Sequence, residues 1–306
     1  PSSVSSIDQT AFDLMTSLEN IYVSSLNDNY CDYQGSLYLK EKDDNDNEIM
    51  RNLLRVPEGK TGTVEFSKDL VTIDKHALYK CSKIEKYQIS EDSLNYYTSP
   101  TLGYLYNKSI DTLLSVPQGN SNTVRFEATT TKIDKDAFVD CDKISYVIFT
   151  ENITDIDPET FKGMANIDTI SPNSMILNDL DTYFELNNIH TISLQDDLDA
   201  TYFLAGIDKE GTPKDYIDAL PDDLSIAISS NNQRYTNIDG VIYSKDSPLK
   251  AIYRVLKSVQ GDFVIPNDVN IISVNAFKNN QLTSVYIPDS VDYIKANAFT
   301  SNRNFS

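Results

Sequence analysis

Two short patterns of apolar and polar residues alternate along the chain. The first has three apolar residues in six, as in Ile84-x-x-Tyr87-x-Ile89, and it ends with the alternation typical of a strand that buries one face. The second is Ile-Asp-x-x-Ala-Phe, which is complete at residues 7–12 and 133–138. Variants of the second pattern begin at Ile73, Ile156, Ile272 and Ile294. Each copy is therefore expected to supply a short strand and an apolar turn.

The last apolar residue of each strand pattern marks the spacing of the copies. In chain order these markers are Val23, Phe66, Ile89, Phe126, Phe149, Pro172, Leu194, Ile228, Ile265 and Ile287. The base spacing is 22–23 residues, and each longer gap is one period with an insertion. One copy cannot bury its own apolar face, so the copies must stack into a β-rich solenoid. Ten strands, here called rungs, would make a sheet of roughly 45 Å at ~4.8 Å per strand.

Three of the longer gaps contain segments of matching composition. Each begins with Gly, continues as an alternating strand and returns as an apolar strand, at about 35–57, 103–117 and 240–256. This order predicts β-hairpins inserted into the solenoid. A Tyr precedes each hairpin in a polar stretch: Tyr30, Tyr96 and Tyr235.

Residues 197–224 do not follow the repeat. Lys209–Pro213 suggest a loop, and Lys214–Leu220 suggest a short helix. We interpret this segment as an atypical insertion in one elongated solenoid domain that spans residues 1–306.

The repeat and the hairpins together resemble the BspA-type leucine-rich repeat proteins. The resemblance rests on Ile-x-x-x-Ala-Phe followed by Cys or a small polar residue, and on Gly-Val-Ile-Tyr-Ser-Lys at 240–245. It extends from Ile7 to Phe299 and lapses around Asp197–Leu224. The family is associated with secreted or surface-attached proteins of host-associated microbes that act in adhesion and protein binding. The resemblance therefore implies an extracellular or cell-surface protein.

The charge of the chain narrows its partners. The sequence has 46 Asp and Glu against 26 Lys and Arg, which gives a formal net charge of −20. Nucleic acids and anionic membrane surfaces are bound by basic footprints, so neither is an expected partner. No segment has the ~20 apolar residues that would insert into a bilayer. With 19 Tyr, no Trp and many Asn, the composition suits β-structure with polar turns.

Few residues are available for catalysis or for holding a cofactor. The two histidines, His76 and His190, lie in different copies without a neighbouring Cys, which disfavours a metal site or an activated nucleophile. Cys81 and Cys141 occupy the same position in two copies separated by further rungs, so buried thiols are expected rather than a disulfide. We therefore predict no enzymatic activity, no catalytic residue, no metal and no cofactor.

The acidic run Asp43–Glu48 raises the question of calcium. An EF-hand loop that began at Asp44 would place Ile49 at the Gly position and Arg55 at the position of the bidentate Glu. We interpret the run as a solvated hairpin tip. The sequons at Asn107, Asn152 and Asn304 would matter only in a eukaryotic secretory pathway.

The repeat also builds one exposed face, from the residue between the two apolar positions of each rung. The binding candidates at these positions are Tyr22, Glu65, Gln88, Arg125, Ile148, Ser193, Val264 and Tyr286, and Ala227 occupies the same register. Their mixture of polar, aliphatic and aromatic side chains suits contact with a protein or a glycan. Each of them can equally be an ordinary exposed strand residue.

Three functions remain open. The first is adhesion or protein binding through this face, with glycan binding as a variant. The second is a structural spacer that projects another domain of a larger surface protein. The third is an enzyme, which would need an acid–base pair assembled from distant copies.

Overall fold

The computed structural model describes residues 1–43, 45–120, 122–161, 164, 166–196, 198–214, 219–245 and 250–302. The chain forms two compact units. The N-terminal unit consists of Pro1–Ile144 with Asn152–Met164, and the C-terminal unit consists of Ser145–Glu151 with Ala165–Ser306. Both units are stacks of short strands, with few helices, so the predicted β-solenoid is confirmed.

Strands alone form the regular structure described in the N-terminal unit. They are β1 (Tyr30–Tyr33), β2 (Ser36–Lys42), β3 (Glu48–Arg55), β4 (Gly62–Phe66), β5 (Thr72–Ile73), β6 (Ile84–Ile89), β7 (Tyr96–Thr98), β8 (Leu105–Asn107), β9 (Thr112–Ser115), β10 (Asn122–Val124), β11 (Lys132–Ile133) and β13 (Asp155–Ile156).

The C-terminal unit combines strands with short helices. Its strands are β12 (Ile144–Ile148), β14 (Thr169–Ser171), β15 (Thr191–Leu194), β16 (Ser225–Ile228), β17 (Tyr235–Ile238), β18 (Val241–Ser244), β19 (Lys250–Val255), β20 (Gln260–Val264), β21 (Val269–Ile272), β22 (Gln281–Tyr286) and β23 (Tyr293–Ile294). Its helices are α1 (Ser174–Asn178), α2 (Leu180–Tyr183), η1 (Leu186–Asn188) and α3 (Thr201–Ala205).

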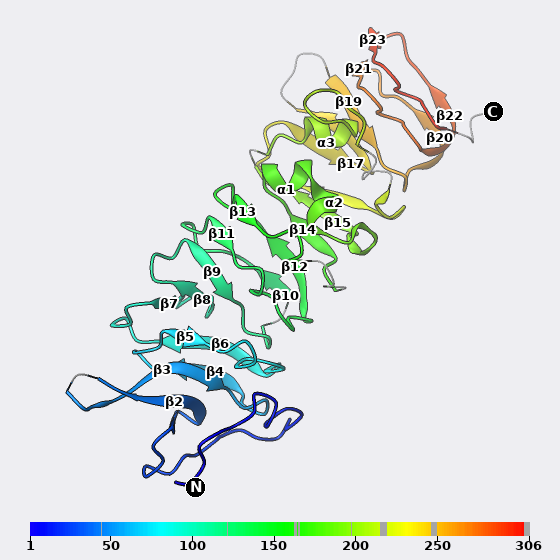
Figure 1. Ribbon diagram of the computed structural model, residues 1–306. Helices are drawn as coiled ribbons and strands as arrows, with labels where there is room; N and C mark the ends of the chain where they lie inside the picture. The colour runs from blue at the N-terminus through cyan, green and yellow to red at the C-terminus, as the bar shows by residue number, and fades with distance from the viewer. Residues whose placement is uncertain are drawn as a thin grey trace. The chain divides into compact units, whose positions relative to one another are not determined.

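Each turn of the solenoid contributes to two columns of parallel strands. Figure 1 shows β3 and β5 stacked in one column and β4 and β6 in the other. The rung column has the predicted register, because the marker Phe66 lies opposite Ile89, and Leu194 lies opposite Ile228. The second column contains the isoleucines of the Ile-Asp-x-x-Ala-Phe pattern. Pro172 directly follows the last residue of β14, as expected of a residue that cannot donate to a ladder.

The Ile-Asp-x-x-Ala-Phe pattern has a local physical cause. The Asp74 side chain accepts a hydrogen bond from the backbone N–H of His76 at 2.9 Å, and the Asp74 carbonyl accepts one from Ala77 N–H at 2.9 Å. Asp134 makes the same two contacts with Asp136 and Ala137. The Asp therefore closes an Asx turn, and the small Ala beyond it is fully buried where backbone segments approach each other.

Each predicted hairpin is confirmed, and each has one more strand than expected. The antiparallel order is β1-β2-β3 in the first module, β7-β8-β9 in the second and β17-β18-β19 in the third. The additional first strand begins at Tyr30, Tyr96 or Tyr235. The return strand then joins the second column in parallel, with Leu53 opposite Ile73 in the first module. The hairpins are thus built into the solenoid turns.

Two of the hairpin turns explain the Gly that opens each module. Gln34 and Gly35 have φ of 49° and 75°, and Asp239 and Gly240 have φ of 50° and 84°. Two consecutive left-handed residues are typical of the type I′ turn that joins antiparallel strands. Gly is favoured at the second position, where φ is larger and an added Cβ would crowd the Asn20 side chain at Gly35 and the Val259 side chain at Gly240.

The expectation of one uninterrupted sheet of ten rungs is wrong. β4 and β6 form a two-stranded sheet, and β20 and β22 form another. A hairpin module follows β6, and its first strand β7 is antiparallel to β8 instead of extending the rung ladder. The inserted strands therefore interrupt the rung ladder at a module.

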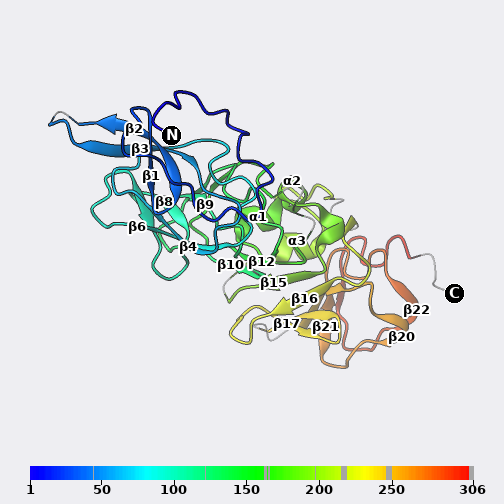
Figure 2. The ribbon, with the colours of Figure 1, turned by 90° about the horizontal axis from the view of Figure 1, so that it is seen from below.

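The helices replace part of the second column in the C-terminal unit. Figure 2 shows α1 and α3 on one side of this unit and β15 and β16 on the other. α3 packs against β19 and α1, and it supplies the buried residues Phe203 and Leu204. It lies in the segment 197–224, whereas most of the helix expected over Lys214–Leu220 falls outside the described residues.

Aromatic rings from different turns contact each other inside both units. The rings of Phe138 and Phe161 lie 5.0 Å apart in the N-terminal unit, and those of Phe277 and Phe299 lie 4.8 Å apart in the C-terminal unit. Cys81 and Cys141 are free, buried thiols, as predicted. Each donates to a backbone carbonyl at 3.5 Å, Cys81 to Val56 and Cys141 to Val116. The thiols therefore have a repeated structural position.

Candidate functional site

The structure places most of the predicted binding residues on rung strands. Neighbours in the same ladder lie directly opposite each other: Glu65 opposite Gln88, and Val264 opposite Tyr286. Val264 is 66% exposed and Tyr286 is 64% exposed. These side chains therefore line up within each ladder, and those of Val264 and Tyr286 face solvent.

Other candidates in the C-terminal unit also lie in paired strands. Ser193 is opposite Ala227, and Ile148 is opposite Ser171. Ser193 and Ile148 are only partly exposed, whereas Ala227 is exposed. The exposed surface at these positions is interrupted at β14, because Ser171 is fully buried.

Two candidates lie outside the rung strands. Tyr22 is 79% exposed in an irregular segment, which is held to the first module by a hydrogen bond from Val23 N–H to the Asp32 carboxylate at 2.8 Å. Arg125 is exposed directly after β10. The Glu65 carboxylate already has a partner within the fold, because it accepts a hydrogen bond from the Tyr33 hydroxyl at 2.7 Å.

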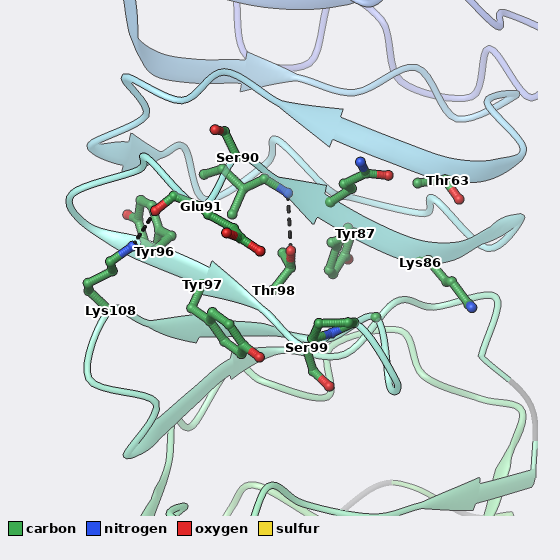
Figure 3. Close-up of a pocket in the computed structure, with 14 residues that line it drawn as sticks. Thr63, Lys86, Tyr87, Ser90, Glu91, Tyr96, Tyr97, Thr98, Ser99 and Lys108 are labelled. Atoms are coloured by element: carbon green, nitrogen blue, oxygen red, sulfur yellow. Dashed lines mark hydrogen bonds between the residues drawn. The ribbon is translucent and has the colours of Figure 1, made fainter.

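A groove lies beside β6, where the second hairpin module begins. It has a volume of about 580 Å³ and runs between β6 and β7, which is the first strand of the second module. Figure 3 shows Glu91 and Thr98 between these strands, with Tyr97 beside them. Gln88 is the one predicted site residue that lines the groove. Further side chains that line the groove are those of Thr63, Lys86, Ser90, Ser99 and Lys108.

The backbone N–H groups of β6 that face the groove are already paired. Ile89 N–H donates to the Thr98 hydroxyl at 3.1 Å, and Tyr87 N–H donates to the Gly103 carbonyl at 2.8 Å. The Lys108 ammonium donates to the Glu91 carbonyl at 2.9 Å and fixes the end of the groove. These N–H groups are therefore not available to a ligand in the groove.

The C-terminal unit contains an equivalent groove at the third module. It has a volume of about 370 Å³ and lies between β16 and β17. Ala227 lines this groove at the rung position that Gln88 occupies in the first groove. Lys245 lines it at the module position that Lys108 occupies in the first groove. The Asn237 amide donates to the Ile226 carbonyl at 2.8 Å across the gap. The hairpin modules thus generate the grooves by their construction.

Sequence reasoning missed a lysine at the end of each Gly-x-x-Tyr-x-Lys segment. Lys40 donates to the carbonyls of Ser25 and Asn27 at 3.2 and 3.0 Å, and Lys245 donates to those of Ser230 and Asn232 at 3.4 and 2.8 Å. The signal was present in the sequence, because Lys40, Lys108 and Lys245 share one module position.

Burial favours the neutral form of the cysteine thiols and of several tyrosines. Burial raises the pKa of the Cys31 thiol to about 11 and that of the Cys81 and Cys141 thiols to about 12. Burial also raises the pKa of Tyr87, which forms the floor of the first groove. A nucleophilic cysteine needs a lowered pKa, so these thiols are structural.

The histidines lie in unrelated surroundings. His190 is half-exposed, and its Nδ1 is 3.1 Å from the Asp168 carboxylate and 3.2 Å from the Asn188 carbonyl. His76 is partly buried in an Asx turn, with its ring 5.7 Å from that of Tyr79. These contacts place each histidine within a local turn or loop.

The acidic hairpin tip is a hydrogen-bonded turn. The Asp43 carboxylate accepts from the backbone N–H groups of Asn45 and Asn47, and Asp46 pairs with Lys42 at 2.6 Å. Asp44, at which the tested calcium loop would begin, lies outside the described residues. Within the described part of the chain, no three His, Cys, Asp or Glu side chains lie close enough to hold a metal ion.

Two of the sequon asparagines are engaged in the fold. The Asn107 amide donates to Ser109 and Asp111 at 3.1 and 2.7 Å, and the Asn152 amide donates to the Ala128 carbonyl at 2.8 Å. Asn304 lies outside the described residues. None of the helices in the described ranges is long and apolar enough to cross a bilayer.

Comparisons with known proteins agree with the repeat. The model of the BspA type leucine rich repeat region matches in six copies, over residues 59–112, 118–203 and 256–306. A search of curated proteins gives no match.

Three solved structures are similar to the chain, each at low identity. A leucine-rich repeat protein from Eubacterium ventriosum is 16% identical with a TM-score of 0.32, and the match covers 83% of this chain and 65% of that one. A leucine rich cell surface protein from Faecalibacterium prausnitzii has the same identity and TM-score, with 90% and 75% covered. The pneumococcal vaccine antigen PcpA is 14% identical with a TM-score of 0.35, with 77% and 56% covered.

Proposed function

Because the chain belongs to the BspA-type leucine-rich repeat proteins, we propose that it acts at the cell surface or outside the cell as a non-enzymatic binding protein. Its partner in this proposal is a protein, contacted through the exposed rung positions. Membership of a family associated with secreted and surface-attached proteins supports the location. Adhesion to a host or matrix protein is the form of binding that the family resemblance favours.

One observation carries the proposal. Val264 and Tyr286 lie opposite each other on β20 and β22, and both side chains are about two-thirds exposed. An aromatic and an aliphatic side chain held side by side on a rigid sheet lose little entropy on binding, and aromatic residues are enriched at protein interfaces. The pair therefore suits the centre of a protein contact.

The test compares variants of this pair with a matched control. We expect the double variant V264S/Y286S to lose about tenfold or more in affinity for whichever immobilised extracellular-matrix protein the native chain binds. Tyr293 is 60% exposed but lies on β23 in the second column, so Y293S is expected to bind as the native protein does. Surface plasmon resonance measures both variants.

Two results would contradict the proposal. One is an equal loss of affinity in Y293S and V264S/Y286S, which would mean that binding does not depend on the exposed rung positions in particular. The other is a combination of two observations. The native chain would bind none of the immobilised extracellular-matrix proteins, and cells would lose adhesion only when a neighbouring domain is deleted. That second result would support the spacer function.

A further inference from the structure

The groove beside β6 has a chemistry that the proposed protein contact does not use. We propose that it binds a neutral hexopyranose unit of a glycan, with Tyr97 as the stacking surface and Gln88 and Glu91 as hydrogen-bonding partners. Tyr97 is not among the exposed rung positions. The inference is therefore independent of protein binding through Val264 and Tyr286.

The side chains that line the groove match the chemistry of a sugar. Thr63 and Ser90 contribute hydroxyls, Gln88 an amide and Glu91 a carboxylate. A pyranose has both hydroxyls that need such partners and a flat set of C–H bonds. The face of an aromatic ring carries partial negative charge and attracts those C–H bonds. Tyr97 lies beside Glu91 at the groove, so one ligand can meet both kinds of surface (Figure 3).

The size of the groove is adequate for such a ligand. Ligand pockets in proteins span roughly 300–1,000 Å³. The groove, with its volume of about 580 Å³, accommodates a short oligosaccharide.

The backbone around the groove disfavours a polypeptide as the occupant. A peptide that binds as an added strand needs free N–H groups on the edge it joins. The N–H groups of Tyr87 and Ile89 are donated to Gly103 and Thr98, so the β6 edge is closed to a new strand. This pairing excludes a peptide that binds by strand addition, whereas a sugar can be recognised through the side chains of the groove.

The charges favour a neutral sugar over an acidic one. Glu91 adds a carboxylate to the groove, and the chain as a whole has a formal net charge of −20. The Lys108 ammonium is held by the Glu91 carbonyl. Lys86 also lines the groove and would attract an anion locally. An acidic sugar would still meet repulsion from the Glu91 carboxylate and, at long range, from the net charge of the chain, whereas a neutral sugar meets neither.

The equivalent groove of the third module provides an internal comparison. By alignment of the modules, Thr236 stands where Tyr97 stands, and Ala227 stands where Gln88 stands. That groove lacks the stacking ring and the amide, so it is not expected to bind the same sugar. Y97T consequently converts one residue of the first groove to its natural counterpart in the third module, and Thr is well tolerated in a strand.

The test uses glycan binding by the full chain. The probes are immobilised lactose, N-acetyllactosamine, mannotriose, chitotriose and sialyllactose, with biolayer interferometry as the readout. We expect the native chain to bind at least one of the four neutral probes more tightly than sialyllactose. Y97T and Q88A are expected to lose about tenfold or more in affinity, whereas T236Y and V264S/Y286S bind as the native chain does. Circular dichroism confirms that the variants are folded.

Several outcomes would overturn the proposal. They are binding to none of the five probes, a preference for sialyllactose, and native-like binding by folded Y97T and Q88A. Protein binding that is abolished by Y97T would also overturn it, because the groove would then take a polypeptide. The proposed protein contact can fail by itself. In that case V264S/Y286S and the native chain would have the same affinity for the immobilised matrix proteins, and the glycan affinities would be unaffected.

Discussion

Arg55 is a buried cation that alternation alone would not predict. It stands in a strand between apolar neighbours, which reads as an exposed polar position, yet it is only 2% exposed. Its guanidinium donates to the Glu58 carboxylate at 2.8 Å and to the His76 carbonyl at 2.7 Å. Glu58 also accepts from Leu14 N–H at 2.8 Å. Arg55 and Glu58 therefore join the N-terminal segment to the first turns of the solenoid.

Removal of this guanidinium is expected to destabilise the chain strongly. R55M leaves the Glu58 carboxylate buried without its cation, and loss of one partner of a buried ion pair costs about 3–5 kcal/mol in the free energy of unfolding. The matched control is R51M in the same strand, since Arg51 is exposed and 3.9 Å from Glu41. An exposed pair contributes about 1 kcal/mol or less. Urea denaturation followed by circular dichroism measures both variants.

A second variant separates charge burial from packing. In R55M/E58L both members of the pair become apolar, so much of the lost stability should return. The interpretation fails if R55M and R51M unfold at the same urea concentration. It also fails if R55M/E58L is no more stable than R55M.

At the scale of elements, each hairpin module is fastened to its own preceding turn by a lysine. Lys245 reaches back from the end of β18 to the carbonyls of Ser230 and Asn232, just before β17. Asn232 in turn accepts from the backbone N–H of Tyr235 at 2.8 Å, where β17 begins. The ammonium of Lys245 and the Asx turn at Asn232 together provide hydrogen bonds for backbone groups of this loop, which has no neighbouring strand to provide them.

Loss of this contact should loosen one module without unfolding the chain. In K245M, the carbonyls of Ser230 and Asn232 lose a charged donor, and hydrogen bonds to charged groups contribute about 1.5–3 kcal/mol. We expect faster hydrogen–deuterium exchange confined to β17 and the loop before it. K135M, at an exposed lysine of the Ala-Phe turn, is the control and should exchange as the native protein does. Unchanged exchange in K245M would show that the ammonium does not hold the loop.

The hairpin modules also show how far the sequence predicts elements. Gly and the alternating strand that follows it predict β2, β8 and β18 because turn chemistry and side-chain period are local properties. The first strand of each module was missed, since β7 and β17 consist largely of polar and aromatic residues without an alternating apolar face. Their strand character depends on pairing with the next segment, which is a property of the folded module.

At the scale of the whole molecule, the fold is predictable and the grooves are not. A period of 22–23 residues implies stacked turns because each turn buries the face of its neighbour, and this argument needs only the spacing of apolar residues. The groove beside β6 depends on the point at which a module interrupts the rung ladder. Gln88 was identified from its register, whereas Tyr97 and Glu91 have no repeat position that would single them out.

The buried tyrosines are expected to make the free energy of unfolding fall at high pH. Burial raises the pKa of Tyr104 to about 12, and it also raises the pKa of Tyr38, Tyr87 and Tyr235. Burial likewise raises the pKa of the Cys81 thiol to about 12. In the unfolded chain, these groups would lose their protons near their ordinary values of 9.0 for Cys and 10.0 for Tyr.

This difference fixes the sign of the pH dependence. Above about pH 9 the unfolded chain binds fewer protons than the folded chain, so the free energy of unfolding falls as pH rises. The stability from these neutral groups is fully present below pH 9 and is lost progressively towards pH 12. Urea denaturation at a series of pH values should show the midpoint falling across this window. Tyrosinate absorbance should appear in two phases, exposed tyrosines first and buried ones only as circular dichroism reports unfolding.

Conservative variants test whether the buried hydroxyl is responsible. In Y104F the Tyr104 ring remains and the ionisable group is lost, so the fall in stability with pH should become shallower. Y286F removes the hydroxyl of an exposed tyrosine and should leave the slope unchanged. A slope that is equally shallow in both variants would contradict the assignment to buried groups. So would reversible titration of all 19 tyrosines near pH 10 with the solenoid still folded, because it would show that the interior does not hold these side chains neutral.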